Sequence, residues 1–345
     1  FSVLGYNDVE GLRLRLGGRT YFGQNDLWRM EGFGAFGFKD QKFKYGLSGK
    51  VLVSKKNRKI LFGGHRKDIE QTGASLTNSK DVLGRNRASS GLITVGANDR
   101  LTSIELTTLG YQMEPVKNFT FRVLGSHRIL KSASETFSLS YYDQNGDIKS
   151  TLKQSELELG INYTPGRKTS GYGVERRVIN GGDFPSFFLG YTFGLEDVLQ
   201  SDFDYHRIQA LYTQPWNVGG LGRLYTTIEL GKIVGTVPLG LLSPIPGNQT
   251  LWSIYNTFTQ LDYYEFVSDT YASFHLKHNF GGRLFGRVPW LRELNLRELV
   301  GFRSVWGQLS QSNNSINVGI DNLPIRYQSP EDIYWEWSAG VGNIF

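Results

Sequence analysis

Apolar and polar positions alternate one by one along two neighbouring segments near the start of the chain. In the segment 43–54 every second residue is apolar or glycine, and most of the residues between are lysine, serine or glycine. The segment 27–38 alternates in the same way, and only a short polar connection around Asp40 and Gln41 separates the two. Alternation with period two across a tight connection predicts a β-hairpin. Strands of about twelve residues exceed the roughly five or six of globular sheets and reach the about nine to eleven of a membrane-spanning strand. We therefore predict a transmembrane antiparallel β-barrel.

Segments of the same kind recur along the chain and give about fourteen candidate strands, with twelve to sixteen as the range. The weak run 90–97 is included because we expect that counting it places the long segments 131–153, 234–268 and 307–332 all on one side, as long loops of outer-membrane barrels are, and that omitting it places some of them on the wrong side. A side hairpin is also predicted around Asn145-Gly146, a favoured tight turn. The candidate strands are 9–17, 27–38, 43–54, 58–67, 90–97, 101–112, 119–123, 156–163, 187–195, 203–213, 221–233, 271–280, 296–306 and 333–343.

The basic residues on these strands indicate which face is the lumen. Arg13 and Arg15 share one face of the strand 9–17, and leucines occupy the other face. Arginine does not face hydrocarbon without a large cost, so the apolar face is expected to contact lipid and the basic face to line the lumen. The basic side chains expected in the lumen are Arg13, Arg15, Arg29, Lys44, Lys50 and Arg122.

Two interpretations of this basic lumen remain open. The cations could attract anions into a pore, or they could pair with acidic residues on neighbouring strands. We favour pairing because like charges that are buried together repel one another. The candidate acidic partners are Glu10, Glu31, Glu105, Glu156 and Glu158.

Composition agrees with a barrel and narrows the class of partner. The 345 residues include 42 glycines and 14% aromatic residues, which suit strand curvature and interfacial aromatic belts. The mean hydropathy of −0.32 is uninformative, because lipid-facing and lumen-facing residues cancel in any window. The net charge of +6 is spread over strands rather than gathered in a helix or tail, so we expect lipid and lipopolysaccharide as partners and no nucleic acid.

The sequence contains few residue patterns that could carry catalysis or bind a cofactor or metal. The chain has no cysteine, no Gly-x-Ser-x-Gly elbow and no phosphate-binding glycine loop, so we expect no cofactor, no metal and no enzymatic activity. His275 and His278 lie three residues apart on a predicted strand and therefore point to opposite faces. One alternative is an enzyme at the barrel rim in which His275 acts with Asp262 or Asp269.

One long connection is unusually apolar for an external loop. Within the segment 234–268, the stretch from Pro238 to Pro246 is rich in leucine and isoleucine. It could fold into the lumen as a plug, dock a partner, or pack on neighbouring loops. The residues of this candidate loop are Pro238, Leu239, Leu241, Leu242, Ile245 and Pro246.

Three segments carry a resemblance to a known family: residues 9–19 (VEGLRLRLGGR), 214–225 (QPWNVGGLGRLY) and 261–266 (LDYYEF), which leads into the strand with His275. Over nearly its whole length the chain resembles an uncharacterised outer-membrane β-barrel family of Bacteroidota. In that family a carboxypeptidase-regulatory-like periplasmic sandwich often precedes the barrel, and the chain runs a few dozen residues further. The resemblance thus implies that residues 1–345 are the barrel without the sandwich, and that Phe345 is not the natural end. The alternative is that Phe345 is the terminal aromatic residue of an insertion signal.

These observations lead to one functional hypothesis and two alternatives. We expect an integral protein of a Gram-negative outer membrane that acts without catalysis, together with other envelope proteins, in outer-membrane protein export or biogenesis. The alternatives are a solute transporter or porin with a basic lumen, and the rim enzyme described above. A remote link to the barrel-insertase superfamily is compatible with the family's preceding periplasmic domain, but no motif establishes it.

Overall fold

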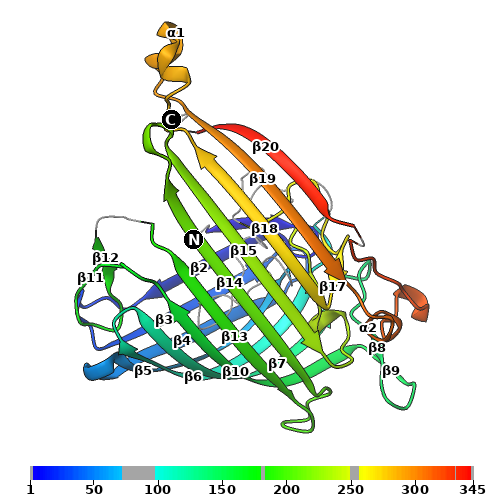
Figure 1. Ribbon diagram of the computed structural model, residues 1–345. Coiled ribbons are helices and arrows are strands. Elements are labelled where there is room, and N and C mark those ends of the chain that lie inside the picture. The colour runs from blue at the N-terminus through cyan, green and yellow to red at the C-terminus, as the bar shows by residue number, and fades with distance from the viewer. Residues whose placement is uncertain (1–2, 72–97, 180–182, 249–255, 331, 343–345) are drawn as a thin grey trace.

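A single antiparallel sheet of fourteen strands forms the body of the protein (Figure 1). The computed structural model describes residues 3–71, 98–179, 183–248, 256–330 and 332–342. Each strand pairs with the next long strand in the sequence, so the sheet is an up-and-down meander that curls into a barrel. In order the strands are β1 (Leu4–Asn7), β2 (Gly11–Arg19), β3 (Trp28–Gly37), β4 (Phe43–Ser54), β5 (Lys59–Glu70), β6 (Thr102–Val116), β7 (Phe119–Ser132), β10 (Thr151–Tyr163), β13 (Ser186–Leu195), β14 (Tyr205–Asn217), β15 (Arg223–Val234), β18 (Thr270–Asn279), β19 (Arg297–Gln308) and β20 (Tyr334–Gly342).

The predicted barrel of about fourteen strands is confirmed, but one strand is not where the sequence placed it. The predicted strand 90–97 lies outside the described residues, and β5 pairs directly with β6 over eleven residue pairs, so no strand separates these two in the sheet. The fourteenth strand is instead β1, which pairs with the start of β2. The long segments 131–153, 234–268 and 307–332 do share one end of the barrel. Whether these three segments share one end does not depend on a strand at 90–97, because all three follow that run in the chain.

The connections divide between two ends of the barrel. The loop end carries the connections 8–10, 38–42, 71–101, 133–150, 196–204, 235–269 and 309–333. The turn end carries the connections 20–27, 55–58, 117–118, 164–185, 218–222 and 280–296. Figure 1 shows β8, β9, β17 and α2 together at the lower right, β11 and β12 at the left, and α1 at the top of the view.

Short elements occupy these connections. The predicted side hairpin around Asn145-Gly146 is present as β8 and β9. Among the described residues no helix is long and apolar enough to cross a membrane. The short elements are η1 (Lys56–Arg58), β8 (Tyr141–Tyr142), β9 (Ile148–Lys149), β11 (Thr169–Ser170), β12 (Arg177–Val178), η4 (Gly219–Leu221), η5 (Leu239–Leu241), β16 (Ser243–Pro244), β17 (Val267–Ser268), η6 (Phe285–Arg287), α1 (Pro289–Arg292), α2 (Gln311–Ser315) and η7 (Ile320–Asn322).

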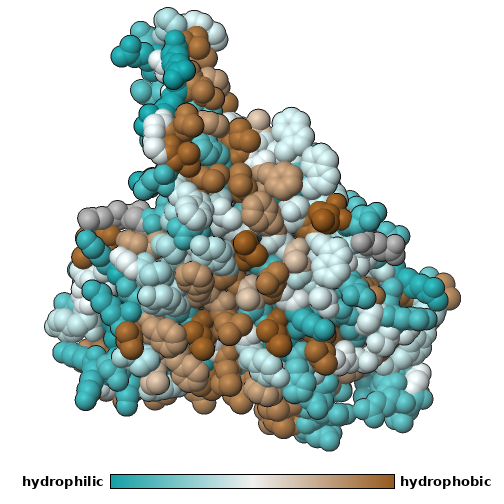
Figure 2. Space-filling view, in the orientation of Figure 1, coloured by the Kyte–Doolittle hydropathy of each residue, from teal (hydrophilic) through white to brown (hydrophobic). Residues whose placement is uncertain are grey.

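Side chains along the strands separate by parity into an apolar outer face and a polar inner face. On β2, Leu16 is 65% exposed on the outside whereas Arg13 is only 2% exposed inside. On β4, Leu47 is exposed and Lys44 is buried. Apolar side chains accordingly cover much of the outer wall in Figure 2, and polar ones gather toward its two ends. This inversion of the usual globular arrangement is that of a transmembrane barrel.

The arrangement of apolar side chains outside and polar side chains inside is found in the middle of the wall but not everywhere near the rims. Ile104 and Leu106 alternate with Glu105 and Thr107 on β6, and an apolar outer face would put the isoleucine and leucine toward lipid. They point inward instead and are buried. They lie under apolar residues of the loops, in the same cluster as Leu241, so this expectation from alternation alone was wrong.

Glycine lets large aromatic side chains lie flat across the inner wall. A Cβ atom on Gly231 of β15 would lie 2.2 Å from the ring of Tyr271 on β18. These two residues are direct partners in the strand register. Any side chain larger than hydrogen at Gly231 would therefore displace the tyrosine, which is why glycine occupies this position in mid-strand.

We predict that arginine is tolerated unequally along the outer face. Leu47→Arg, near the middle of β4, should lower the free energy of unfolding by about 2–4 kcal/mol, because a cation is costly at the bilayer midplane. Ser103→Arg, on the outer face of β6 close to the loop end, is the matched control and should cost about 0–1 kcal/mol. Urea unfolding in lipid vesicles, followed by tryptophan fluorescence, measures both. Equal losses for the two variants would contradict the assignment of the lipid-facing belt.

Candidate functional site

Buried charges at the loop end of the lumen neutralise one another. The Glu10 carboxylate, fully buried in the connection before β2, accepts hydrogen bonds from Asn7 Nδ2 at 2.7 Å and Arg13 Nη1 at 2.9 Å. Lys44 Nζ lies 2.8 Å from the same carboxylate. Arg13 Nη2 donates at 2.7 Å to Asp68 of β5. Because each cation here has a carboxylate within hydrogen-bond distance, this wall is a paired network rather than a track of free positive charge.

Three other basic residues singled out from the sequence also lie on the inner face. The Arg15 guanidinium lies 3.9 Å from the centre of the Phe33 ring, and the Arg122 guanidinium lies 5.2 Å from that of Phe62. Both distances suit a cation–π contact. Lys50 is half-buried on the inner face of β4. The six basic residues therefore do not converge on one site.

Part of the apolar connection after β15 lies inside the barrel. We call residues 237–248 the plug loop, and all of them are buried. Leu239 and Leu241 pack in one cluster with Leu130 of β7 and Leu152 of β10. A Cβ atom on Gly240 would lie 2.9 Å from a methyl carbon of Leu152, so the loop backbone rests directly on the wall. The residues singled out from the sequence, Pro238, Leu239, Leu241, Leu242, Ile245 and Pro246, all belong to this buried stretch.

Polar contacts fix the plug loop in place. Arg207, buried on the inner face of β14, donates a hydrogen bond to the carbonyl of Leu241. The backbone N–H of Leu239 donates at 2.7 Å to the side-chain oxygen of Asn317 in the connection after β19. The loop thus satisfies its backbone groups inside the lumen, as a buried segment must.

A second segment packs on the inner wall at the turn end, and nothing in the sequence pattern singled it out. We call residues 171–176 the clip. Val174 lies in an apolar cluster with Leu52, Ile60, Phe62 and Leu124 from the inner wall. Arg58 donates to the carbonyls of Gly173 at 2.8 Å and Val174 at 3.1 Å.

Ion pairs hold both sides of the clip. Glu175 pairs with Arg29, the remaining basic residue predicted in the lumen, which also pairs with Asp26 at 3.2 Å. Arg176 pairs with Glu114 at the end of β6. Burial, and then repulsion from Arg58, lowers the pKa of Arg176 to about 10. Arg176 therefore stays protonated at neutral pH, and the clip keeps its charge contacts there.

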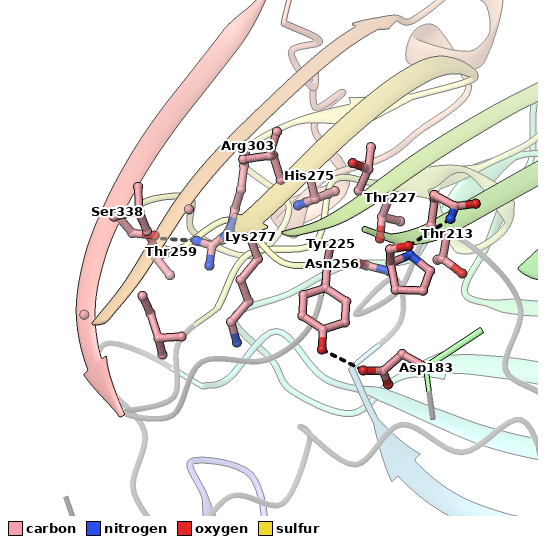
Figure 3. A pocket seen from close by; sticks show the side chains of 18 of the residues that line it. Asp183, Thr213, Tyr225, Thr227, Asn256, Thr259, His275, Lys277, Arg303 and Ser338 are labelled. Atoms are coloured by element: carbon pink, nitrogen blue, oxygen red, sulfur yellow. Dashed lines mark hydrogen bonds between the residues drawn. The ribbon is translucent and has the colours of Figure 1, made fainter. Parts of the chain in front are cut away.

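The inner wall on the other side of the barrel borders a cavity of about 420 Å³, which we call the lumen chamber (Figure 3). The inner faces of β14, β15, β18, β19 and β20 and the segment 256–259 surround it. In Figure 3, Lys277 and Tyr225 extend in the same direction, and the Tyr225 hydroxyl donates at 2.6 Å to Asp183. Its polar lining comprises Asp183, Thr213, Gln214, Tyr225, Thr226, Thr227, Asn256, Thr259, His275, Lys277, Arg303 and Ser338.

His275 lines this chamber, and neither Asp262 nor Asp269, the acidic residues considered as its catalytic partners, is among the residues that line it. The Asp269 carboxylate accepts hydrogen bonds from the backbone of Ser310 at 2.7 Å and from Asn313 at 3.0 Å, so it anchors the connection after β19. The charged residues whose fields reach His275 are Arg303 and Glu336. His278 points outward as predicted and lies 2.8 Å from the carbonyl of Leu221.

Metal binding finds no support in the described ranges. Within them no group of three or more histidine and acidic side chains is placed to hold an ion.

A buried cluster that the sequence analysis did not identify joins Arg128 and Tyr205 to the Glu156 carboxylate. Alternation placed Glu156 on the inner face, but only the strand register could have shown which residues meet it.

Comparison with known proteins assigns a family and a fold. No curated protein matches the chain. BamA from Haemophilus ducreyi lacking POTRA domains 1–3 superposes with a TM-score of 0.53 at 12% identity, over 98% of this chain and 62% of that chain. The chain therefore spans about three fifths of that BamA chain, and at this identity the likeness shows the fold alone.

Two further solved structures match with lower scores. OccK3 (OpdO) from Pseudomonas aeruginosa matches with a TM-score of 0.35 at 14% identity, over 87% of this chain and 75% of that chain. OmpT, an outer membrane protein of Vibrio cholerae, matches with a TM-score of 0.36 at 10% identity, over 98% of this chain and 92% of that chain.

A family of unknown function, DUF5686, matches the sequence through the model of its C-terminal domain. The match covers residues 127–320, which is more than half of the chain. The chain belongs to the DUF5686 family, and its fold is that of an outer-membrane β-barrel.

Proposed function

We propose that this chain is an integral outer-membrane barrel with a closed lumen that acts, without catalysis, in an envelope assembly for outer-membrane protein export or biogenesis. The observation that carries the proposal is the plug loop. A solute channel needs a continuous polar path, whereas residues 237–248 fill the loop end with an apolar cluster. At the turn end the clip covers the inner wall of β4, β5 and β7. A barrel whose lumen is occupied in this way is better suited to holding partners than to passing solutes.

The comparisons supply weaker support of a different kind. The BamA structure superposes over nearly the whole of this chain, and BamA has POTRA domains, of which 1–3 are lacking from that structure. The sequence resemblance to a Bacteroidota family with a preceding periplasmic sandwich implies a similar plan. We therefore place this barrel in the outer membrane of such a bacterium, with the turn end in the periplasm, because long loops of these barrels face outward.

A projection at the turn end provides a surface for a periplasmic partner protein. The connection 280–296 rises beyond β18 and β19 and carries α1 at its tip (Figure 1). Trp290 is 73% exposed, and Leu284 and Leu294 are also exposed. An exposed tryptophan flanked by arginines resembles the composition of protein-interface hot spots. We propose that this projection contacts another component of the assembly.

Both alternative functions would require parts of the structure to move, whereas the proposed function requires no such movement. A porin with an anion-selective lumen needs the plug loop to leave the barrel and expose the cluster around Leu239 and Leu241. A rim enzyme needs His275 to meet a carboxylate, and its charged neighbours Arg303 and Glu336 already engage each other at 2.7 Å.

Co-purification tests membership in an assembly. Tagged protein extracted from outer membranes in mild detergent should migrate as a particle larger than the single chain and carry other envelope proteins. Trp290→Ala should remove at least half of the co-purified partner, because such anchors each contribute about 2 kcal/mol or more. Trp337→Ala, at an exposed tryptophan on the outer face of β20, is the matched control and should leave the partner bound. Isolation of the wild-type chain as a lone particle would count against the proposal.

Conductance tests the closed lumen. The wild-type barrel should give no steady current in a planar bilayer, because the apolar cluster around the plug loop obstructs the loop end. Combining Leu241→Asp with Arg58→Ala should open a conducting path, since the aspartate disrupts the plug cluster and the alanine removes two hydrogen bonds to the clip. Leu323→Asp with Arg58→Ala is the control, because Leu323 is exposed outside the lumen. Steady anion current through the wild-type protein would favour the porin alternative.

A further inference from the structure

The outer wall changes from apolar to polar close to the loop end on four neighbouring strands, β5, β6, β7 and β10 (Figure 1). Leu109 of β6 and Leu157 of β10 are exposed at the same level of this wall, because Gly125 of β7 is the register partner of both. Each row nearer the loop end contains polar or charged residues, so the hydrocarbon layer ends just beyond these leucines. Toward the loop end the outer-face rows are His65, Thr107, His127 and Ser155, then Lys67, Glu105, Ile129 and Lys153, and finally Ile69, Ser103, Lys131 and Thr151.

The polar row next to the leucines forms hydrogen bonds within the wall. His65 Nδ1 lies 2.9 Å from the hydroxyl oxygen of Thr107, its direct partner in the register. His127 Nδ1 lies 2.9 Å from the hydroxyl oxygen of Ser155, which is its direct partner on β10. These contacts let polar side chains lie at the edge of the hydrocarbon layer. The groups that extend away from the wall are the lysines of the next two rows.

Three lysines and only one carboxylate lie on those two rows. Lys67 and Lys131 are exposed, and among the described residues neither has an ion-pair partner. Lys153 Nζ donates at 2.5 Å to the neutral side chain of Gln200, so its charge is not balanced there. Glu105 is the direct register partner of Lys67, so it balances one lysine at most. We call Lys67, Lys131 and Lys153 the lysine patch, which has a net positive charge.

The rest of the wall near the loop end is apolar rather than basic. Phe193 of β13, Val234 of β15 and Trp306 of β19 occupy outer-face positions there. Along the described strands from β13 to β19, Lys232 is the only lysine on the outer face. Aromatic side chains are the usual residues of a barrel at this depth. The lysine patch is therefore a local feature that insertion into a membrane does not by itself require.

We propose that the lysine patch binds the phosphate groups of a lipopolysaccharide molecule in the outer leaflet. The ammonium groups donate charge-assisted hydrogen bonds to the phosphate oxygens. The acyl chains lie on the apolar wall beyond the histidine row, where Leu109 and Leu157 are exposed. The choice of leaflet rests on the orientation given under the proposed function, whereas the binding itself depends only on this surface.

The spacing of the lysines suits a head group with more than one phosphate. Lys131 and Lys153 are diagonal neighbours on β7 and β10, about 7–8 Å apart, so their flexible side chains reach one phosphate together. Lys67 lies three strands from Lys153 in the same row, about 14 Å away. It would therefore contact a second phosphate of the same molecule.

Titration of the purified barrel with lipid A, the phosphorylated lipid anchor of lipopolysaccharide, tests this binding by thermophoresis in detergent. Diphosphorylated lipid A should bind, and lipid A without its phosphates should bind at least tenfold more weakly. Inorganic phosphate at millimolar concentration should not displace the bound lipid, because it lacks the acyl chains. Displacement by phosphate would indicate a site for a soluble anion and overturn the proposal.

A double variant tests the lysines themselves. Lys67→Gln with Lys131→Gln should weaken lipid A binding about tenfold or more, because each lysine near an anionic lipid surface contributes about fivefold. Lys117→Gln with Lys232→Gln is the matched control, since it removes two exposed lysines away from the patch and should bind as the wild type does. The proposal is overturned if lipid A without phosphates binds equally well, if the patch variant keeps the wild-type affinity, or if the control loses as much.

A fluorescent label provides an independent readout, because the chain has no cysteine and accepts a single introduced thiol. Thr107→Cys places a fluorophore on the outer face of β6 next to the patch, and Leu230→Cys places one on the outer face of β15. Lipid A with a quencher on an acyl chain should quench the first label more strongly than the second. Adding Lys67→Gln and Lys131→Gln should remove this difference. Equal quenching at both positions in the otherwise unaltered barrel would contradict a site at the patch. Loss of the periplasmic partner in Trp290→Ala does not affect any of these results, so the two proposals fail separately.

Discussion

Hydrocarbon around the barrel tolerates no unpaired polar group, and this constraint determines most of the architecture. It requires every strand to hydrogen-bond to its neighbours and forces apolar side chains to the outside. Because strand side chains alternate, the same requirement sends every other residue into the lumen. Leu16 and Arg13 on β2 show the two results on one strand. The interior must then stabilise many polar groups in a confined space.

The protein meets this second demand in two ways. Near the loop end Glu10 accepts hydrogen bonds from Arg13 and lies within hydrogen-bond distance of Lys44, so charges from three segments neutralise one another. At both rims, connections fold back and replace water with apolar contacts, through Leu241 at one end and Val174 at the other. The lumen chamber lies in the remaining part of the interior. Among the described residues, neither ring nitrogen of the buried His275 in its wall has a hydrogen-bond partner.

Sequence alternation predicted the fold class, the number of strands and the inward face of Arg13 and Lys44, because these depend on local parity. It could not place the strand β1, which is too short to show a pattern, and it misassigned Ile104 because apolar loops cover the inner wall there. The clip was missed for a related reason. Contacts such as that of Arg58 with Gly173 join residues over a hundred positions apart, and the local sequence pattern of neither segment predicts a contact with the other.

The plug loop and the clip share a geometrical property. The plug loop follows β15 and rests on β7 and β10, while the clip follows β10 and is held by β3 and by the turn after β4. Each one spans the interior from one part of the wall to another. They act as internal struts, so the cross-section of the cylinder resists flattening independently of the hydrogen bonds within its wall. Sideways pressure from lipids or from a neighbouring protein would be transmitted through these struts to the strands on which they rest.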